Sequence, residues 1–323
     1  MSLEELTQLA TLYYVDGLTQ EDLAKRFSIS RIKVGRLLKR AAEEGIVEIR
    51  VRHHPRATQA LEQALMDRFG IQRAIISVDH NDLDSQRELL AGLVASYLDR
   101  VITDGSLVAV GMGRNVSAVS HHAVSTTQRS SSFICAIGGS YRGGEAMNAD
   151  HICRRLASRF GGESETLYAP AVINDEHAMR SLLANDTVRQ SLNKAQRADI
   201  ALVGVGDILE DSNMVRMGWF TSEEIASVRA LGAVGDIMGY DFVDIHGQPA
   251  STPLQGRVIG LTLADLRRIP NVIAIASEPT KVTGILGALR TGAINTLATT
   301  QSIAQTVLSL AQATEPRAPT ASP

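Results

Sequence analysis

From residue 74 onward the sequence repeats one pattern: a short apolar run, a glycine-rich or polar loop, then an amphipathic helical segment. A strand that is buried on both faces reads as a continuous apolar run, and the next parallel strand requires a crossover helix. The repetition therefore predicts a mostly parallel sheet with helices on both faces. Strands are expected at 74–78, 107–111, 132–137, 166–169, 200–205 and 272–276. Helices are expected at 85–101, 115–124, 147–160, 178–197, 221–230, 280–291 and 300–312.

The composition is compatible with such a fold and indicates the compartment in which the protein acts. Hydrophobic residues make up 44% of the 323 residues, and only 4% of the residues are aromatic. No apolar run is long enough to span a bilayer, and the N-terminus has no basic-then-apolar signal pattern. We therefore expect a cytoplasmic protein with no membrane partner. Cys135 and Cys153 lie in no CxxC motif or histidine cluster, which predicts reduced thiols and no metal site.

Near the N-terminus the sequence has the spacing of a helix-turn-helix. A helical segment over 3–16 is ended by Gly17, and Thr19 is a good N-cap for a second helix over 20–26. Only residues 28–30 separate this helix from a third one, which the last of these residues can cap. A turn of this length between two short helices is typical of DNA-binding units.

The third helix is basic on one side and apolar on the other. Val34, Leu37, Leu38 and Ala41 recur at helical spacing and form a narrow stripe that packs inward. Between residues 25 and 40 there are seven basic residues and no acidic one, although the formal net charge of the chain is -3. A cationic face of this width is attracted to DNA phosphates whatever the base sequence.

The exposed side chains of this helix differ in what they can reach on DNA. Arg36 and Lys33 can reach guanine edges, and Ile32 can touch a thymine methyl group, whereas the other basic residues are suited to phosphates. The expected DNA contacts are Thr19, Gln20, Ser30, Arg31, Ile32, Lys33, Arg36, Lys39 and Arg40. The alternating segment 46–51 predicts a small β-wing after the helix. The alternative is that the basic residues form the solvated face of a helical protein-interaction domain.

These patterns predict an α/β protein of two domains. An N-terminal winged helix-turn-helix is followed by a Rossmann-like α/β effector-binding domain, and the proline-broken polar stretch 52–56 marks the boundary. The expected parts are a DNA-binding domain over 1–52, a linker and linker helix over 53–70, an effector-binding domain over 71–312 and a disordered Pro-rich tail over 313–323.

Polar and glycine residues follow several of the predicted strands. Small ligands of open α/β sheets bind at the carboxyl ends of the strands, so these residues are expected to form a polyol-sized or sugar-phosphate-sized pocket. Two glycines let a backbone approach a ligand, and helix N-terminal amides beside an arginine suit an anionic oxygen. The expected pocket residues are Gly111, Gly113, Arg114, Asn115, Gly139, Ser140, Asn148, Asp150, Gly206, Asp236, Glu278 and Lys281.

Each of these loops also has a purely structural interpretation. A glycine after a strand often only forms a turn, Asp236 can merely cap its Gly-rich turn, and Lys281 can be a solvated residue of a first helical turn. Lysine is unfavourable at the positive end of a helix dipole unless an anion lies near it. The loop at 111–116 is not GxGxxG because position 116 is valine, so no dinucleotide cofactor is expected.

The chain up to about residue 312 resembles the SorC family of bacterial sugar-responsive transcriptional regulators. The resemblance lies in the order and spacing of YYVDGLTQEDLAKRFSISRIKVGRLLKRA, VGMGRN, AIGGS, YAPAVI, ALVGVGD, GAVGDIMGYDFVDIHG and SEPTKVTGILGALRTGAINTLATT.

The resemblance implies an effector domain akin to sugar-phosphate isomerases and glucosamine-phosphate deaminases that binds ligand without turning it over. It also implies homodimers or homotetramers on double-stranded operator DNA, with affinity altered by a sugar, polyol or sugar-phosphate effector. Gly113, Arg114 and Asn115 match the family's phosphate loop, Asp236 its acidic turn and Lys281 its lysine. Many members have a hydroxyl residue where Asn115 stands, so an unphosphorylated polyol stays open as the effector.

Two other functions remain open at this point. One is an active sugar-phosphate isomerase or deaminase with a DNA-binding appendage, for which Asp236, Glu278 and Lys281 could supply acid–base groups. No dedicated acid–base dyad is identifiable, and we expect no enzyme activity. The other is a constitutive DNA-binding protein without an effector, against which the long, loop-rich second domain argues.

Overall fold

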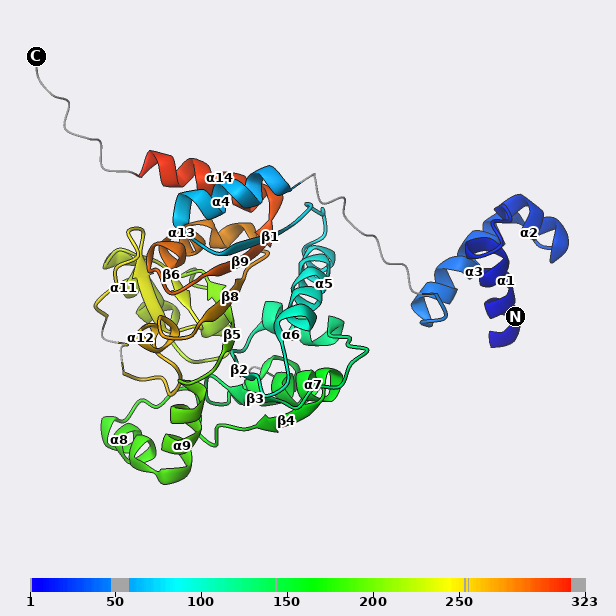
Figure 1. Ribbon diagram of the computed structural model, residues 1–323. Helices are drawn as coiled ribbons and strands as arrows, with labels where there is room; N and C mark the ends of the chain where they lie inside the picture. Colours follow the sequence, from blue (N-terminus) through cyan, green and yellow to red (C-terminus); the bar gives the residue numbers. More distant parts are fainter. Residues whose placement is uncertain (1, 48–57, 143, 253, 255, 315–323) are drawn as a thin grey trace, which may run out of the picture. The chain divides into compact units, whose positions relative to one another are not determined.

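The structure is a computed structural model that describes residues 2–47, 58–142, 144–252, 254 and 256–314. The chain divides into two compact units, Met1–His54 and Pro55–Pro323 (Figure 1). Most of the predicted tail, from residue 315 on, lies outside the described residues, as does most of the predicted β-wing, from residue 48 on.

The first unit is a three-helix bundle made of α1 (Leu3–Tyr14), α2 (Gln20–Arg26) and α3 (Arg31–Glu43). Ser2 and Thr19 cap the first two helices with reciprocal capping boxes, and the Ser30 hydroxyl accepts the Lys33 amide at the start of α3. The apolar stripe that the sequence predicts on α3 is buried, which confirms its orientation. The buried core consists of Leu6, Leu9, Ala10, Leu23, Val34, Leu37, Leu38 and Ala41.

The second unit is built on a sheet that contains nine strands among the described residues. The strands are β1 (Arg73–Ser77), β2 (Leu107–Val110), β3 (Ser131–Cys135), β4 (Gly162–Glu165), β5 (Ile200–Gly206), β6 (Ala233–Ile237), β7 (Asp241–Asp244), β8 (Asn271–Ile275) and β9 (Thr296–Thr300). Seven of them pair in parallel in the order β1-β9-β8-β5-β2-β3-β4. The predicted mostly parallel sheet is therefore confirmed.

Helices cover both faces of this sheet. In Figure 1, α4, α13 and α14 lie together on one side, and α5, α6 and α7 lie on the other. The helices are α4 (Gln59–Phe69), α5 (Leu83–Val101), α6 (Arg114–His122), α7 (Ala149–Phe160), α8 (Glu176–Ala184), α9 (Asp186–Ala195), α10 (Asn213–Arg216), α11 (Ser222–Ala230), α12 (Leu263–Leu266), α13 (Val282–Arg290) and α14 (Gln301–Ala313), with short 3-10 turns η2 (Glu145–Met147) and η3 (Pro279–Lys281).

Alternate residues of each central strand are buried in different cores. In β2, Val108 and Val110 pack in the core on the α5 side, whereas Ala109 between them packs in the core on the α13 side. Because a strand side chain points to opposite faces at successive positions, two apolar cores require a continuous apolar strand. The central strands can therefore be recognised in the sequence as continuous apolar runs.

The β6–β7 hairpin departs from the predicted pattern. Residues 232–240 were expected to be a Gly-rich turn around Asp236, but 233–237 form β6, which pairs antiparallel with β7 and with the end of β5. Gly206 of β5 lies opposite Asp236 in this pairing. The hairpin thereby brings Asp236 to the carboxyl end of the parallel sheet.

Other elements also differ from the prediction. The strand expected at 166–169 lies earlier, at 162–165, because β4 is an exposed edge strand of Gly, Glu and Ser without an apolar run. The single helix expected at 178–197 is two helices, since Asn185 adopts an extended conformation and caps α9. The Thr-rich strand β9, at 296–300, was not predicted.

Candidate functional site

The basic face of α3 is exposed on the first unit. Ile32 keeps 72% of its surface exposed, and Lys33 and Arg36 are exposed beside it, as are Arg31, Lys39 and Arg40. Arg40 forms an ion pair with Glu44 in the last turn, Nε to Oε1 at 2.5 Å. An exposed isoleucine between two long cations is a combination that can contact both thymine methyl groups and guanine edges.

The expected DNA contacts at the helix starts have structural partners already. The Thr19 hydroxyl accepts the Asp22 amide and donates to the Asp22 carboxylate. Ser30 accepts the Lys33 amide. Gln20, the first residue of α2, lies against α3, where its Oε1 would be 3.8 Å from a Cβ at Gly35. Thr19 and Ser30 thus position the two helices.

A cavity of about 310 Å³ lies at the carboxyl ends of the parallel strands in the second unit. Loops that follow β2, β5, β6 and β8 line it. Of the pocket residues expected from the sequence, it brings together Gly113, Arg114, Asn115, Gly206, Asp236, Glu278 and Lys281. A cavity of this size matches the lower end of the range for small-molecule sites.

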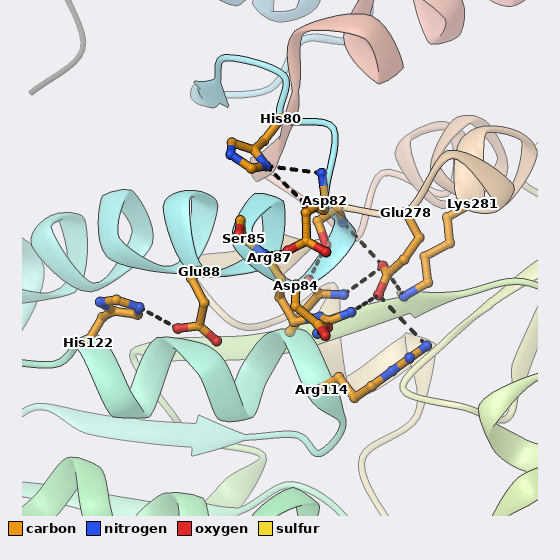
Figure 2. A network of polar contacts seen from close by, with 12 residues as sticks. His80, Asp82, Asp84, Ser85, Arg87, Glu88, Arg114, His122, Glu278 and Lys281 are labelled. Atoms are coloured by element: carbon orange, nitrogen blue, oxygen red, sulfur yellow. Dashed lines mark hydrogen bonds and ion pairs between the residues drawn. The ribbon is translucent and has the colours of Figure 1, made fainter. Parts of the chain in front are cut away.

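One buried carboxylate, that of Glu278, organises the polar wall of this cavity. Figure 2 shows Arg87, Arg114 and Lys281 converging on it from three different elements. The Lys281 ammonium lies 2.8 Å from Oε2, an Arg87 nitrogen 3.5 Å from Oε1, and an Arg114 nitrogen 3.9 Å from Oε1. Lysine is unfavourable at a helix N-terminus unless an anion lies near it. For Lys281 that anion is the carboxylate of Glu278.

Asn115 holds the same carboxylate from the start of α6. Its Nδ2 donates to Glu278 Oε2 at 2.8 Å, and its Oδ1 accepts the Ser277 hydroxyl at 2.7 Å. Both ends of the Asn115 amide are thus engaged within the protein, so Asn115 positions Glu278. Burial alone would raise the pKa of Glu278, but the Lys281 ammonium and the hydrogen bonds from Lys281 and Asn115 outweigh burial and hold the pKa at about 2.

The pKa of Asp236 is raised, whereas that of Glu278 is lowered. It is 1% exposed, its Oδ1 accepts the Gly239 amide at 2.5 Å, and its Oδ2 has no hydrogen-bond partner among the described residues. Burial raises the pKa of Asp236 to about 7, and the nearby Asp207 carboxylate adds to the rise. The cavity therefore holds one carboxylate that stays ionised and a second that changes protonation near neutral pH.

Three features of the cavity lie outside the set of pocket residues expected from the sequence. Arg87 of α5 is 7% exposed and pairs with Asp84 at 2.5 Å as well as with Glu278. The sequence contains an indication of this role, because Arg87 falls on the apolar stripe of its helix, where an unpaired charge is unfavourable. Asp207, at the end of β5, accepts the Thr280 hydroxyl at 2.7 Å. The apolar wall is formed by Trp219, Met112, Met214, Met217 and Met238.

The remaining expected pocket residues lie elsewhere. Gly139, Ser140, Asn148 and Asp150 line a second cavity, and Gly111 lines neither of the two. Asn148 accepts the Ser140 amide and donates to the Ser140 carbonyl, so its amide fixes the loop. The residues that the sequence predicted for one pocket are therefore divided between two cavities, because β3 ends on the far side of β2 from β5 and β8.

The described residues contain neither a metal-binding cluster nor a membrane-spanning helix. Within the part of the chain that the structure describes, no group of three or more His, Cys, Asp and Glu side chains is arranged to hold a metal ion. None of the helices in this same part of the chain has the length and apolar character needed to cross a membrane.

Comparison with known proteins identifies the family. Residues 53–309 match the family model for the Sugar-bind domain, whose description reads "Putative sugar-binding domain". The full-length sorbitol operon regulator SorC from Klebsiella pneumoniae superposes with a TM-score of 0.76 at 26% identity, covering 95% of this chain and 99% of that one. The chain belongs to the SorC family.

Two more relatives support membership of the SorC family. The structure described as "Putative Sugar-Binding Domain of Transcriptional Repressor" from Vibrio fischeri is 49% identical, with a TM-score of 0.73, over 79% of this chain and 99% of that one. The transcriptional regulator LsrR of Enterobacter sp. (strain 638) is 28% identical over 314 residues, 95% of this chain and 94% of the relative. These relatives are regulators and not enzymes, so this SorC-family chain is a transcriptional regulator, and the isomerase or deaminase alternative is set aside.

Proposed function

We propose that this regulator binds operator DNA through α3 and that a small carbohydrate metabolite in the Glu278 cavity changes its operator affinity. We use "Glu278 cavity" for the cavity lined by Arg114, Asp236, Glu278 and Lys281. The observation that carries the proposal is the Glu278-centred cluster at the carboxyl ends of the strands, in the same chain as a helix-turn-helix. The proposal also includes action in the cytoplasm as a homodimer or homotetramer.

The surface of α3 supports the DNA end of the proposal. Ile32 and Arg36 are exposed on the side of α3 opposite its buried stripe, and Lys33 is exposed at the flank of this face. In helix-turn-helix proteins the second helix of the motif enters the major groove and its early residues contact base edges. We assign base contacts to these three residues and phosphate contacts to Arg31, Lys39 and Arg40.

The chemistry of the Glu278 cavity supports a polar, hydroxyl-bearing ligand. Asp236 and Arg114 offer an acceptor and a donor in a cavity that Trp219 and methionine side chains also line. Ligand sites usually combine such an apolar wall with a few placed polar groups. A sugar or polyol has the matching arrangement, with C–H groups on one face and hydroxyl groups around it.

Coupling between the two units requires that ligand favour one arrangement of the protomers. A ligand shifts an equilibrium only through its different affinities for the two states. Helix-turn-helix dimers read two half-sites at a set spacing, so a change in protomer packing alters operator affinity. The sorbitol operon regulator SorC and the transcriptional regulator LsrR, to which this chain is similar, are regulators by name.

The test measures operator affinity of the full chain by fluorescence anisotropy on DNA from the promoter of its own gene, with and without candidate sugars, polyols and their phosphate esters. Wild-type protein is expected to change its affinity with at least one metabolite. Lys281→Ala and Asp236→Ala, shown to be folded by circular dichroism, are expected to lose that response.

Asp150→Ala is the matched control, because Asp150 lines the second cavity and pairs with Arg154 on the surface of α7. This variant is expected to respond as wild type does. If Lys281→Ala and Asp236→Ala respond normally while Asp150→Ala does not, the effector site is not the Glu278 cavity.

A further inference from the structure

The charges that line the Glu278 cavity are balanced within the protein. Among the described residues, four basic and four acidic side chains line it, so their formal charges cancel when all are ionised. The basic residues are Arg87, Arg114, Arg216 and Lys281, and the acidic residues are Asp207, Asp211, Asp236 and Glu278. A phosphate site ordinarily presents a surplus of positive charge to an anion that carries nearly two negative charges at neutral pH.

Each of these cations has an acidic neighbour in the chain. Arg216 pairs with Asp211 at 3.0 Å, Arg87 with Asp84 at 2.5 Å, and Lys281 with Glu278 at 2.8 Å. Arg114 makes the longest contact, 3.9 Å to Glu278, and its side chain is 40% exposed. No cation in this group is left for an incoming phosphate without competition from a carboxylate of the protein.

The position of Glu278 opposes an anion most directly. Its carboxylate lies 2.8 Å from the side-chain Nδ2 of Asn115 and 3.9 Å from the Arg114 guanidinium. Both residues stand at the start of α6, where the family resemblance implies a phosphate. The helix N-terminus supplies only about half a positive charge. A phosphate bound there would have to lie beside a buried carboxylate that stays ionised, because the pKa of Glu278 is about 2.

Asp236 provides an independent indication of the ligand's chemistry. Its Oδ2 is buried without a hydrogen-bond partner among the described residues, although a buried polar atom normally has one. A phosphate oxygen at neutral pH accepts hydrogen bonds, so it can satisfy Asp236 only when the carboxyl group is protonated and not when it is ionised. A hydroxyl group both donates and accepts, so it can satisfy Asp236 in either protonation state.

We infer that the effector of this regulator is a neutral sugar or polyol and that Glu278, the protein's own anion in the cavity, excludes the phosphorylated form. This inference rests on the proposed function, since it concerns the ligand of the same cavity. Glu278 acts here as a specificity residue: its carboxylate is the shared acidic partner of Lys281, Arg87 and Arg114 and completes the charge balance of the cavity. The ligand is then recognised through its hydroxyl groups.

The experiment compares each neutral ligand with its own phosphate ester by isothermal titration calorimetry on the full chain. The probes are erythritol, ribose and sorbitol, each beside its terminal phosphate ester, with inorganic phosphate as a competitor. Wild-type protein is expected to bind at least one neutral probe about tenfold or more tightly than the matching ester. Inorganic phosphate is expected not to displace the neutral probe, a measurement that needs no variant.

Glu278→Gln keeps the size of the side chain and removes its charge, which leaves four basic and three acidic side chains among the described residues that line the cavity. This variant is expected to bind the phosphate ester about tenfold more tightly than wild type does. Glu88→Gln is the matched control: it makes the same change of charge at a half-exposed residue that pairs with His122 and does not line the cavity. It is expected to keep the wild-type preference.

The outcomes separate this inference from the proposed function. If wild-type protein binds an ester more tightly than its neutral parent and the ester changes operator affinity, the inference is overturned and the proposed function stands. If no probe of either series binds or alters operator affinity, the proposed carbohydrate effector fails and the inference fails with it. A neutral preference that reverses or narrows in Glu278→Gln supports both.

Discussion

The carboxylate of Asp236 lies against the backbone of Gly206, so closely that a methyl group at residue 206 would be 2.0 Å from Oδ2. The two residues face each other across the antiparallel pairing of β5 and β6. Only a residue without a side chain permits this approach. Gly206 is therefore required for the buried position of Asp236, and is not merely a turn former after a strand.

Gly206→Ala is expected to destabilise the protein by about 1–3 kcal/mol, because the new methyl group overlaps Asp236 in a closely packed site. The free energy of unfolding is measured by urea denaturation. Gly204→Ala is the control two residues earlier on the same strand, where a Cβ has its nearest neighbour, the Met112 carbonyl, at 3.8 Å. Equal effects of the two substitutions would contradict the close approach.

The raised pKa of Asp236 predicts a pH dependence of stability. Burial raises this pKa from 3.8 to about 7, so between these values the folded protein binds a proton that the unfolded chain has released. The resulting stabilisation is fully present below pH 3.8 and is lost as the pH rises through about 7. Its size is at most about 4 kcal/mol, from a difference of roughly three pKa units.

Asp236→Asn removes this titration while it keeps the shape of the side chain. Wild-type protein is expected to lose more unfolding free energy than the variant between pH 5 and pH 7, measured by urea denaturation at about half-unit steps. Parallel pH profiles for the two proteins would show that Asp236 ionises with an ordinary pKa.

A second glycine contact joins α13 to the same region. A Cβ at Gly284 would lie 2.6 Å from the Gly206 carbonyl oxygen and 3.3 Å from the Gly235 Cα. Gly284→Ala is therefore expected to cost about 1–3 kcal/mol by overpacking, although alanine is the better helix former. Chemical denaturation checks this value.

Gly92→Ala, within helix α5, is the matched helical control. Its Cβ would have only the His122 Nδ1 within contact, at 3.9 Å, so the substitution is expected to be neutral or to stabilise by up to about 1 kcal/mol. A stabilised Gly284→Ala protein would show that α13 can move away from β6 without loss.

Arg36→Ala tests whether α3 reads bases. The substitution is expected to weaken operator binding by about 1–3 kcal/mol and to affect random DNA less, because a base contact exists only on the correct sequence. Fluorescence anisotropy on operator and on shuffled DNA at one salt concentration measures both. Arg189→Ala, on the exposed surface of α9 in the second unit, is the charge-matched control. Equal losses on the two DNAs would make Arg36 a phosphate contact.

Local patterns explain why much of this protein could be predicted from its sequence. The caps at Thr19 and Ser30 and the buried stripe of α3 involve residues within a few positions of one another, so spacing alone reveals them. The central strands could be predicted because both faces of β2, β5 and β8 are buried, so that their sequences are continuously apolar. The exposed edge strand β4 and the Thr-rich β9 lack that signal.

The sequence by itself determined the order of elements, the basic face of α3 and a set of polar residues at strand ends. Only the tertiary structure decided which of those residues meet. Strand order places the loops after β2, β5 and β8 around Glu278 and leaves the loop after β3 in a second cavity. It also brings Arg87 and Asn115 to Glu278 across separations of 191 and 163 residues. Contacts at such separations depend on strand pairing, which no local pattern encodes.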